Sequence, residues 1–358
     1  MGQNASSKFP SNQDDPFLNP DKETTSSPVE LDPTPKPKSV SMLDYSGPYF
    51  SSIFVQNSDS LVLGGTDGNL FYYSQNPPNV CRLNGHTNDI TSLAFDSSLS
   101  LVASGSRDEY ICLWDVSKIA EDKTKHRSYP INNLHGHELT VTALAIDQSQ
   151  LFSGSRDNTV CLWDLNTGSC LNRCSIPRNL VTCVKWIPGE RCVLQSSEDK
   201  HLRVWDTRTM DVVQNLLHPQ CLLTACDVSQ DGRSFYTSSR GPVENSATAT
   251  RWDRYTGAVL REYPHLSDNL NTCHLCNELN CLITASNGGS LYFWDVEKGV
   301  LLFEKKYYSG PIYSIHRMPG HSDVLCSTHN RGIQIFSFNK STLGPLQPTS
   351  FLIKASIQ

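Results

Sequence analysis

The chain has 358 residues, of which 38% are hydrophobic and 18% are charged. This composition is typical of a globular protein and excludes a chain that is disordered throughout. The formal net charge of -6 argues against a protein whose main partner is the phosphate backbone of a nucleic acid.

The first 38 residues contain seven of the twenty prolines and few apolar side chains, which predicts a disordered arm over residues 1–38. Its opening, MGQNASSK, has glycine at position 2, serine at 6 and lysine at 8, and this pattern matches N-myristoylation at Gly2. One myristoyl chain binds membranes only marginally and reversibly. We therefore expect peripheral membrane attachment that a partner protein helps to complete.

The rest of the chain is organised by a repeat. Trp-Asp dipeptides recur at steps of 49, 42, 47 and 42 residues, and aromatic residues extend the series in both directions: Tyr73, Trp114, Trp163, Trp205, Trp252, Trp294 and Phe336. Within a unit such as SGSRDNTVCLWD, two short apolar strands flank a turn, and further strand-like runs precede and follow them. Four strands in a unit of about 42 residues are typical of a propeller blade.

The Gly-His pairs at residues 85–86 and 136–137 precede SGSRDEYICLWD and SGSRDNTVCLWD. These motifs resemble the WD-repeat β-propeller family, and the resemblance covers nearly the whole chain. It implies an all-β protein, a seven-bladed WD-repeat β-propeller over residues 39–358. Family members close the ring with a strand from the other terminus, and both KSVSMLDY (38–45) and SFLIKAS (350–356) are candidates for it.

Serine, histidine and aspartate side chains in these motifs invite comparison with a hydrolase triad. The family resemblance implies structural hydrogen-bonded tetrads instead. One comprises His86, Ser104, Asp108 and Trp114, and the other comprises His137, Ser153, Asp157 and Trp163, with Ser155 as the alternative serine. A buried carboxylate needs surrounding donors, and an enzyme has no evident use for two triads. We expect a non-enzymatic protein with no catalytic residue and no cofactor.

Some units depart from the motif. The fourth has Arg178-Asn179 where Gly-His is expected, although it keeps Asp199 and Trp205. The fifth and sixth lack the turn aspartate, and inserts occupy residues 117–128 and 240–250. A long loop on a scaffold is a common place for function, but the sequence leaves the role of both inserts open.

Thirteen cysteines are scattered singly through apolar runs, which is typical of reduced, buried thiols in a cytosolic protein. Cys273 and Cys276, in CHLC, have the spacing of half a zinc site. They lie in an expected strand, where residues three apart face opposite sides, so we expect no bound metal. With no leader and no apolar stretch long enough for a bilayer, a soluble, cytoplasmic protein is expected.

On a propeller, the residue before each turn aspartate is exposed on one face of the ring. These residues are Arg107, Arg156 and Glu198, with Thr66 in the first blade. With Arg178, they are candidate partner-binding positions, because neighbouring arginines bind acidic peptides or phosphate through bidentate contacts. A solvated rim without a partner is the alternative.

Residues 178–188, 196–208 and 330–336 resemble the group of WD repeat-containing protein 31. That group is linked to cilia and to regulators of small GTPases, so the resemblance implies a trafficking adaptor at the cilium or its base. A second resemblance competes with it. Trp205-Asp206-Thr207-Arg208 is similar to the Trp-Asp-x-Arg box of cullin-4 ubiquitin ligase receptors, which implies that Arg208 contacts the ligase adaptor and that Asp206 supports it.

Overall fold

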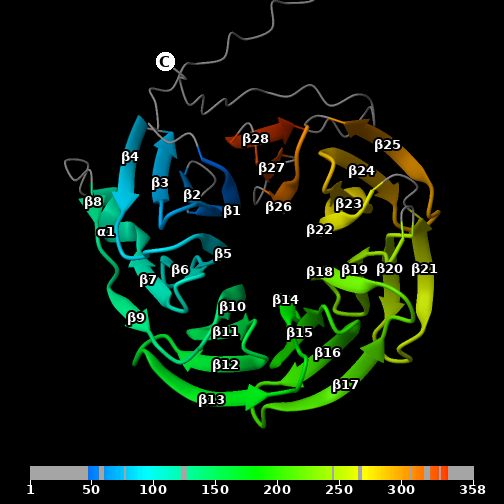
Figure 1. The fold of residues 1–358 in the computed structure, drawn as a ribbon, viewed down its shortest axis with the longest axis horizontal. Coiled ribbons are helices and arrows are strands. Elements are labelled where there is room, and N and C mark those ends of the chain that lie inside the picture. The colour runs from blue at the N-terminus through cyan, green and yellow to red at the C-terminus, as the bar shows by residue number, and fades with distance from the viewer. Residues whose placement is uncertain are drawn as a thin grey trace, which may run out of the picture. The chain divides into compact units, whose positions relative to one another are not determined.

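The computed structural model describes residues 47–55, 60–75, 78–121, 127–243, 246–264, 268–306, 309–317, 323–329 and 332–337. All of them belong to the second of two compact units, residues 37–358. They form seven sheets, which follow one another in a ring (Figure 1). The predicted seven-bladed β-propeller is confirmed. The predicted arm (1–38), with Gly2, and both candidate ring-closing segments (38–45 and 350–356) lie outside the described residues.

We name the blades A to G in chain order, and each strand is hydrogen-bonded to the next within its blade. Blade A contains β1 (Tyr49–Val55), β2 (Ser60–Gly65), β3 (Leu70–Gln75) and β4 (Pro78–Leu83). Blade B contains β5 (Ile90–Asp96), β6 (Leu101–Ser106), β7 (Ile111–Asp115) and β9 (Asn132–Leu134). Blade C contains β10 (Val141–Asp147), β11 (Gln150–Ser155), β12 (Thr159–Asp164) and β13 (Ser169–Ser175).

The second half of the ring repeats this order. Blade D contains β14 (Val181–Trp186), β15 (Cys192–Ser197), β16 (His201–Asp206) and β17 (Asp211–Leu217). Blade E contains β18 (Leu222–Val228), β19 (Ser234–Arg240), β20 (Thr248–Asp253) and β21 (Val259–Pro264). Blade F contains β22 (Leu270–Cys276), the 3-10 turn η1 (Asn277–Leu279), β23 (Cys281–Ser286), β24 (Ser290–Asp295) and β25 (Leu301–Lys306). Blade G contains β26 (Ile312–Arg317), β27 (Asp323–Thr328) and β28 (Gly332–Ser337).

The insert at 117–128 ties two blades together. It begins in the short helix α1 (Val116–Glu121), whose Val116 and Ile119 are buried in the cluster between blades A and B. It ends in β8 (Arg127–Ser128), which pairs in parallel with β4 and so adds a fifth strand to blade A. The expected four strands per unit hold for blades B to F, whereas the described residues supply three strands of blade G.

The hydrophobic core is divided among the junctions between blades, because each junction has its own cluster of buried side chains. In β12, Cys161 and Trp163 pack toward blade B, whereas Val160 and Leu162 pack toward blade D. The two faces of an inner strand are therefore both buried, which explains why its sequence is almost continuously apolar. The first and last blades share such a cluster, in which Leu325 and Ile333 meet Leu61 and Leu63.

Two motif glycines leave room for close neighbours. A Cβ added to Gly154 would lie 2.3 Å from the Cγ1 atom of Val181, in the next blade. A Cβ added to Gly136 would lie 2.8 Å from the indole ring of Trp163, in the same blade. Glycine at these positions is therefore required by packing between backbone and side chain.

We expect Gly154→Ala to lower the free energy of unfolding by about 1–3 kcal/mol, because the new methyl group overlaps Val181 across the C–D junction. Chemical denaturation measures the change. Gly189→Ala measures the cost of backbone strain alone, since Gly189 has a left-handed backbone (φ 75°) and no atom within 4 Å of the added Cβ, whereas the backbone of Gly154 is not left-handed. Unchanged stability of Gly154→Ala would show that the overlap at the blade junction is relieved without cost.

Candidate functional site

Blades B and C each contain a chain of four hydrogen-bonded side chains. In blade B, the indole nitrogen of Trp114 donates to the Ser104 hydroxyl at 2.8 Å, and His86 Nε2 lies 2.8 Å from the same hydroxyl. His86 Nδ1 then lies 3.0 Å from the carboxylate of Asp108, which also accepts the backbone N–H of Thr87. The chain runs from the core to the turn that joins β6 and β7.

Blade C repeats the arrangement and shows which serine takes part. The Ser153 hydroxyl lies 2.7 Å from His137 Nε2 and accepts the indole N–H of Trp163 at 2.8 Å. The Ser155 hydroxyl instead donates to the Leu139 carbonyl oxygen and accepts the backbone N–H of Asp157. Ser153 is therefore the tetrad serine, and Ser155 braces the turn.

The electrostatics of Asp157 match a structural role. Burial by itself raises the pKa of this carboxyl, but hydrogen bonds from His137 and Thr159 outweigh burial and lower the pKa below its ordinary value. The carboxylate is thus held ionised by donors within the blade. Ser153 has no exposed surface, so its hydroxyl is not presented to a substrate.

In blade D, a different set of side chains links the buried tryptophan to the turn aspartate. The sequence motif did not reveal this set. The indole N–H of Trp205 donates to Gln195 Oε1 at 2.7 Å, and Gln195 Nε2 donates to Asn179 Oδ1 at 2.5 Å. Arg203 completes the chain, because it donates to Asn179 at 3.0 Å and to Asp199 at 2.6 Å. Glutamine at the serine position and an arginine four residues after the turn aspartate were the available signals.

Blades E and F keep only the inner part of the tetrad. Their tryptophans, Trp252 and Trp294, donate to the hydroxyls of Thr237 and Thr284 at 3.0 and 3.2 Å. His218 occupies the Gly-His position of blade E and packs its ring against Trp252 at 6.1 Å. The indole N–H therefore has a hydroxyl acceptor even where the turn aspartate is missing.

The candidate partner-binding residues lie on two opposite faces of the ring. Strands alternate in direction within a blade, so the turns at 107–109, 156–158 and 198–200 share one face, which we call the tetrad face. Arg208 follows the far end of β16 and lies on the opposite face.

Two of the arginines on the tetrad face already have acidic neighbours. Arg107, whose side chain is 55% exposed, lies 2.8 Å from Asp89 and 6.0 Å from the centre of the Phe50 ring. Arg156, 51% exposed, lies 3.1 Å from Glu198 of the next blade. Arg178 is also exposed, and within the described part of the chain it forms no ion pair. The structure therefore pairs Arg156 with Glu198 and leaves Arg178 outside this pair.

On the opposite face, Arg208 folds back on Asp206. Its Nε and Nη2 atoms lie 3.0 and 2.6 Å from the two carboxylate oxygens, in a bidentate pair. Hydrogen bonds from Arg208 lower the pKa of Asp206 to about 2. The guanidinium is nevertheless 66% exposed, so its position is defined by Asp206 while one side remains open to solvent.

A cavity of about 350 Å³ opens on the tetrad face, and its lining residues come from the successive blades C to G. Its polar lining comes from five blades: Arg156, Glu198, Arg240, Asn271, Asn287 and Tyr313. Sequence reasoning missed most of these residues, although Arg240 begins the insert at 240–250. Arg240 is exposed, and among the described residues no carboxylate forms an ion pair with it.

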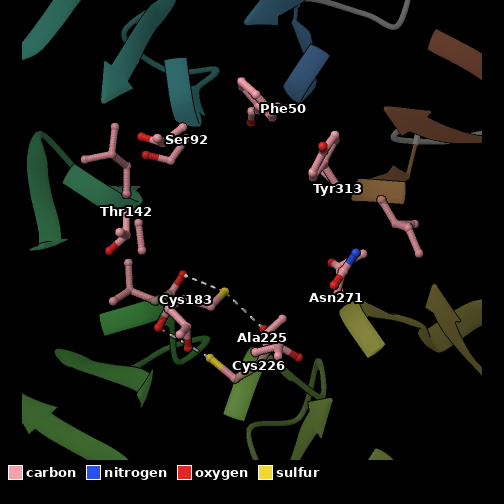
Figure 2. A pocket seen from close by; sticks show the side chains of 18 of the residues that line it. Phe50, Ser92, Thr142, Cys183, Ala225, Cys226, Asn271 and Tyr313 are labelled. Atoms are coloured by element: carbon pink, nitrogen blue, oxygen red, sulfur yellow. Dashed lines mark hydrogen bonds between the residues drawn. The ribbon is translucent and has the colours of Figure 1, made fainter. Parts of the chain in front are cut away.

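The centre of the ring holds a second cavity of about 150 Å³, and Figure 2 shows side chains from the innermost strands around it. Near the tetrad face, one side chain from each blade lines this channel: Phe50, Thr91, Thr142, Thr182, Thr224, Asn271 and Tyr313. Several of them bridge neighbouring blades. Thr142 donates to the Val181 carbonyl oxygen at 2.6 Å, and Asn271 donates to the Ile312 carbonyl oxygen at 3.2 Å.

The cysteines of CHLC point to different parts of the core. Cys273 belongs to the cluster between blades E and F, whereas Cys276 belongs to the cluster between blades F and G. The two thiols are thus directed to opposite faces of β22, as residues three apart on a strand should be. In the described residues, no helix is long and apolar enough to span a membrane.

Comparison with known families agrees with this geometry. The model named "WD domain, G-beta repeat" matches residues 78–115, 128–164 and 168–206. These three matched segments are WD repeats, and the fold of the chain is a seven-bladed β-propeller. The first match starts at β4 of blade A and ends with β7 of blade B, so each sequence repeat supplies the outer strand of one blade and the inner strands of the next. A WD40 propeller scaffold fits a role in protein–protein interaction.

Relatives are distant. The chain is 23% identical to Protein ROOT INITIATION DEFECTIVE 3 of Arabidopsis thaliana over 260 residues, 71% of this chain and 51% of that protein. It is 25% identical to Autophagy-related protein 16 of Arabidopsis thaliana over 266 residues, 73% of this chain and 50% of that protein. The chain thus spans about half the length of these relatives. The solved WD40 beta propeller domain of Doa1 superposes with a TM-score of 0.70 at 21% identity, covering 82% of this chain and 94% of that one.

We expect Asp157→Asn to lower the free energy of unfolding at pH 7 by about 1.5–3 kcal/mol, because the hydrogen bonds to an ionised carboxylate are lost. The pKa of Asp157 is lower in the folded state than in the unfolded state, so its stabilisation is complete above about pH 4 and is lost as the pH falls further. Denaturation series at pH 7 and at acidic pH measure both effects.

The Asp157→Asn variant should lose less stability on acidification than the wild type, and exposed Asp211→Asn should behave like the wild type. Parallel acid profiles of Asp157→Asn and the wild type would contradict the assignment.

Blade D offers two Arg–Asp pairs with the same N–O distance of 2.6 Å, one with an arginine that is 5% exposed (Arg203) and one with an arginine that is 66% exposed (Arg208). We expect Arg203→Met to cost about 3–5 kcal/mol of stability, because Asp199 and Asn179 lose a buried partner. Arg208→Ala should cost much less than Arg203→Met, because solvent screens an exposed pair. Chemical denaturation compares them, and similar costs for both variants would refute the structural role of Arg203.

Proposed function

We propose that the protein is a non-enzymatic adaptor that binds an acidic segment of a partner protein on its tetrad face. This proposal rests on the cavity of about 350 Å³ on that face, whose lining includes Arg240 and Arg156 together with Glu198, the ion-pair partner of Arg156. Asn271, Asn287 and Tyr313 add hydrogen-bonding groups to the same lining. Arginine guanidinium groups bind carboxylates and phosphates in bidentate fashion, and a cavity of this size accepts a few side chains of an extended peptide.

The cellular setting is proposed from sequence. Residues 178–188 and 196–208, which resemble the ciliary group of WD repeat-containing protein 31, also supply Asn179, Arg203 and Asp199 of the unusual chain in blade D. The MGQNASSK motif supports myristoylation of Gly2. The adaptor then works in the cytoplasm, at membranes of the cilium or its base, together with regulators of small GTPases.

A second candidate is supported by the geometry of Arg208. Its bidentate pair with Asp206 holds an exposed guanidinium in one orientation on the face opposite the cavity. A preorganised charge at the rim of a propeller is suited to contact with another protein. In this alternative the protein is a substrate receptor, and Arg208 binds the adaptor of a cullin-4 ubiquitin ligase.

Affinity purification of the full-length tagged protein from ciliated cells separates the two proposals. The wild type and Arg208→Ala should recover the same ciliary or membrane-traffic proteins, and the double charge reversal Arg156→Glu with Arg240→Glu should lose them. Gly2→Ala should become diffuse in the cell and fail to incorporate a clickable myristate analogue, because it lacks the acylated residue.

Two results would contradict the adaptor proposal. Recovery of cullin-4 and its adaptor, lost specifically in Arg208→Ala, would favour the ligase receptor. An unchanged partner set in the Arg156→Glu, Arg240→Glu variant would remove the tetrad-face cavity as the binding site. A diffuse, unlabelled wild type would end the membrane proposal while leaving the binding face to be judged by the purification.

A further inference from the structure

The wall of the central channel is chemically uneven. In blades D, E and F, three cysteines line it: Cys183, Cys226 and Cys273 (Figure 2 labels the first two). Charged and titratable residues follow these cysteines on the same innermost strands and on β26: Lys185, Asp227, His274 and His316. The corresponding positions in blades A to C carry Ile53, Ala94 and Ala145. One side of the channel therefore concentrates thiols beside ionisable groups.

Cys183 and Cys226 face each other across the D–E junction. The Cys183 sulfur lies 3.5 Å from the carbonyl oxygen of Cys226, and the Cys226 sulfur lies 3.8 Å from the carbonyl oxygen of Cys183. Cys183 is half-buried, whereas Cys226 has no exposed surface. A small molecule in the channel thus meets Cys183 first, with Cys226 directly behind it.

The surroundings distinguish the two thiols. The neighbouring Cys226 group and the positive charge of Lys185 lower the pKa of Cys183 below its ordinary value, against the opposing effects of burial and of Asp227. Burial raises the pKa of Cys226 and of Cys273. A larger fraction of Cys183 is therefore thiolate at neutral pH than of an ordinary cysteine. Thiolate is the form that reacts with electrophiles.

We propose that Cys183 is a modification site for small hydroperoxides and that Cys226 is its resolving partner, so that oxidation joins β14 to β18 by a disulfide. The Cys183 thiolate attacks one peroxide oxygen, the O–O bond breaks, and the departing oxygen takes up a proton and leaves as water when the oxidant is hydrogen peroxide. Cys183 is left as a sulfenic acid. The sulfur of Cys226 then attacks it, the S–O bond breaks, and the hydroxide leaves with the Cys226 proton as a second water.

The two thiols together supply the two electrons that reduce one peroxide to two waters. The channel cavity of about 150 Å³ admits hydrogen peroxide but is too small for glutathione, so the resolving thiol is internal. The product is a covalent bridge between the innermost strands of blades D and E. This inference is independent of the partner that binds the tetrad face.

Treatment of the reduced full-length protein with hydrogen peroxide tests the proposal. After denaturation, blocking of free thiols with N-ethylmaleimide and digestion with trypsin, the peptide 179–185 should be linked to the peptide 209–233, with the loss of two hydrogens. The second peptide contains both Cys221 and Cys226. Cys221→Ser should therefore keep the link and Cys226→Ser should abolish it.

Two further readouts keep the test decisive. In Cys226→Ser, the sulfenic acid of Cys183 has no partner, and dimedone should label it. Exposed Cys170, whose pKa is raised, should react roughly tenfold more slowly than Cys183 in the wild type, because little of it is thiolate. Full N-ethylmaleimide labelling of Cys183 after peroxide treatment, or a link that disappears in Cys221→Ser, would overturn the proposal.

Discussion

In blades B to F, the buried indole N–H of a tryptophan is the group around which the blade is built. Trp114, Trp163 and Trp205 are almost fully buried, and leaving such a donor without an acceptor costs about 1–3 kcal/mol. An acceptor must therefore lie on the neighbouring strand, and it is serine in blades B and C and glutamine in blade D. The acceptor is buried in turn and needs its own partner, so the requirement passes outward from strand to strand until it reaches the turn carboxylate. A change of one member consequently demands changes in the others, as the replacement of histidine and serine by Asn179, Gln195 and Arg203 in blade D illustrates.

The blades themselves depend on one another, since no blade encloses a core of its own. Trp163 packs in the cluster that blade C shares with blade B, while Leu162 packs in the cluster shared with blade D. Hydrogen bonds such as that from Thr142 to Val181 join the same neighbours near the channel. Stability in such a repeat architecture comes from the contacts between adjacent units. Both faces of the inner strands are thus buried in packing contacts between blades. Binding of other molecules is therefore expected on the two faces of the ring and in the channel.

The parts of this structure that sequence could predict are those set by local pattern. The Trp-Asp steps predicted seven blades, because each step encloses one complete set of strands, and the Gly-His and Ser-Gly-Ser motifs placed the tetrads of blades B and C. The chain through Asn179, Gln195 and Arg203 escaped prediction, since its members lie on different strands and meet only when β15 pairs with β16. The ion pair of Arg156 and Glu198 joins two blades, as does the pairing of β8 with β4. Such contacts depend on which blades become neighbours and on the lengths of the side chains that meet. The sequence of a single repeat specifies neither.

The pairing of Arg156 with Glu198 bears directly on the proposed binding of an acidic segment at the tetrad face. An acidic segment that approaches Arg156 must displace or rearrange Glu198. Breaking this existing ion pair makes the net binding free energy less favourable. A neutral segment has no such compensation, and a basic segment is attracted by Glu198 but repelled by the guanidinium of Arg240. The Glu198 carboxylate therefore lowers the affinity for acidic segments and favours those whose charges displace it, which is selectivity by electrostatic complementarity. Arg203 and Arg208 in blade D are both paired with aspartate at 2.6 Å but differ in exposure. Arg203 is buried and its pair stabilises the blade, whereas Arg208 is exposed and can contact another protein.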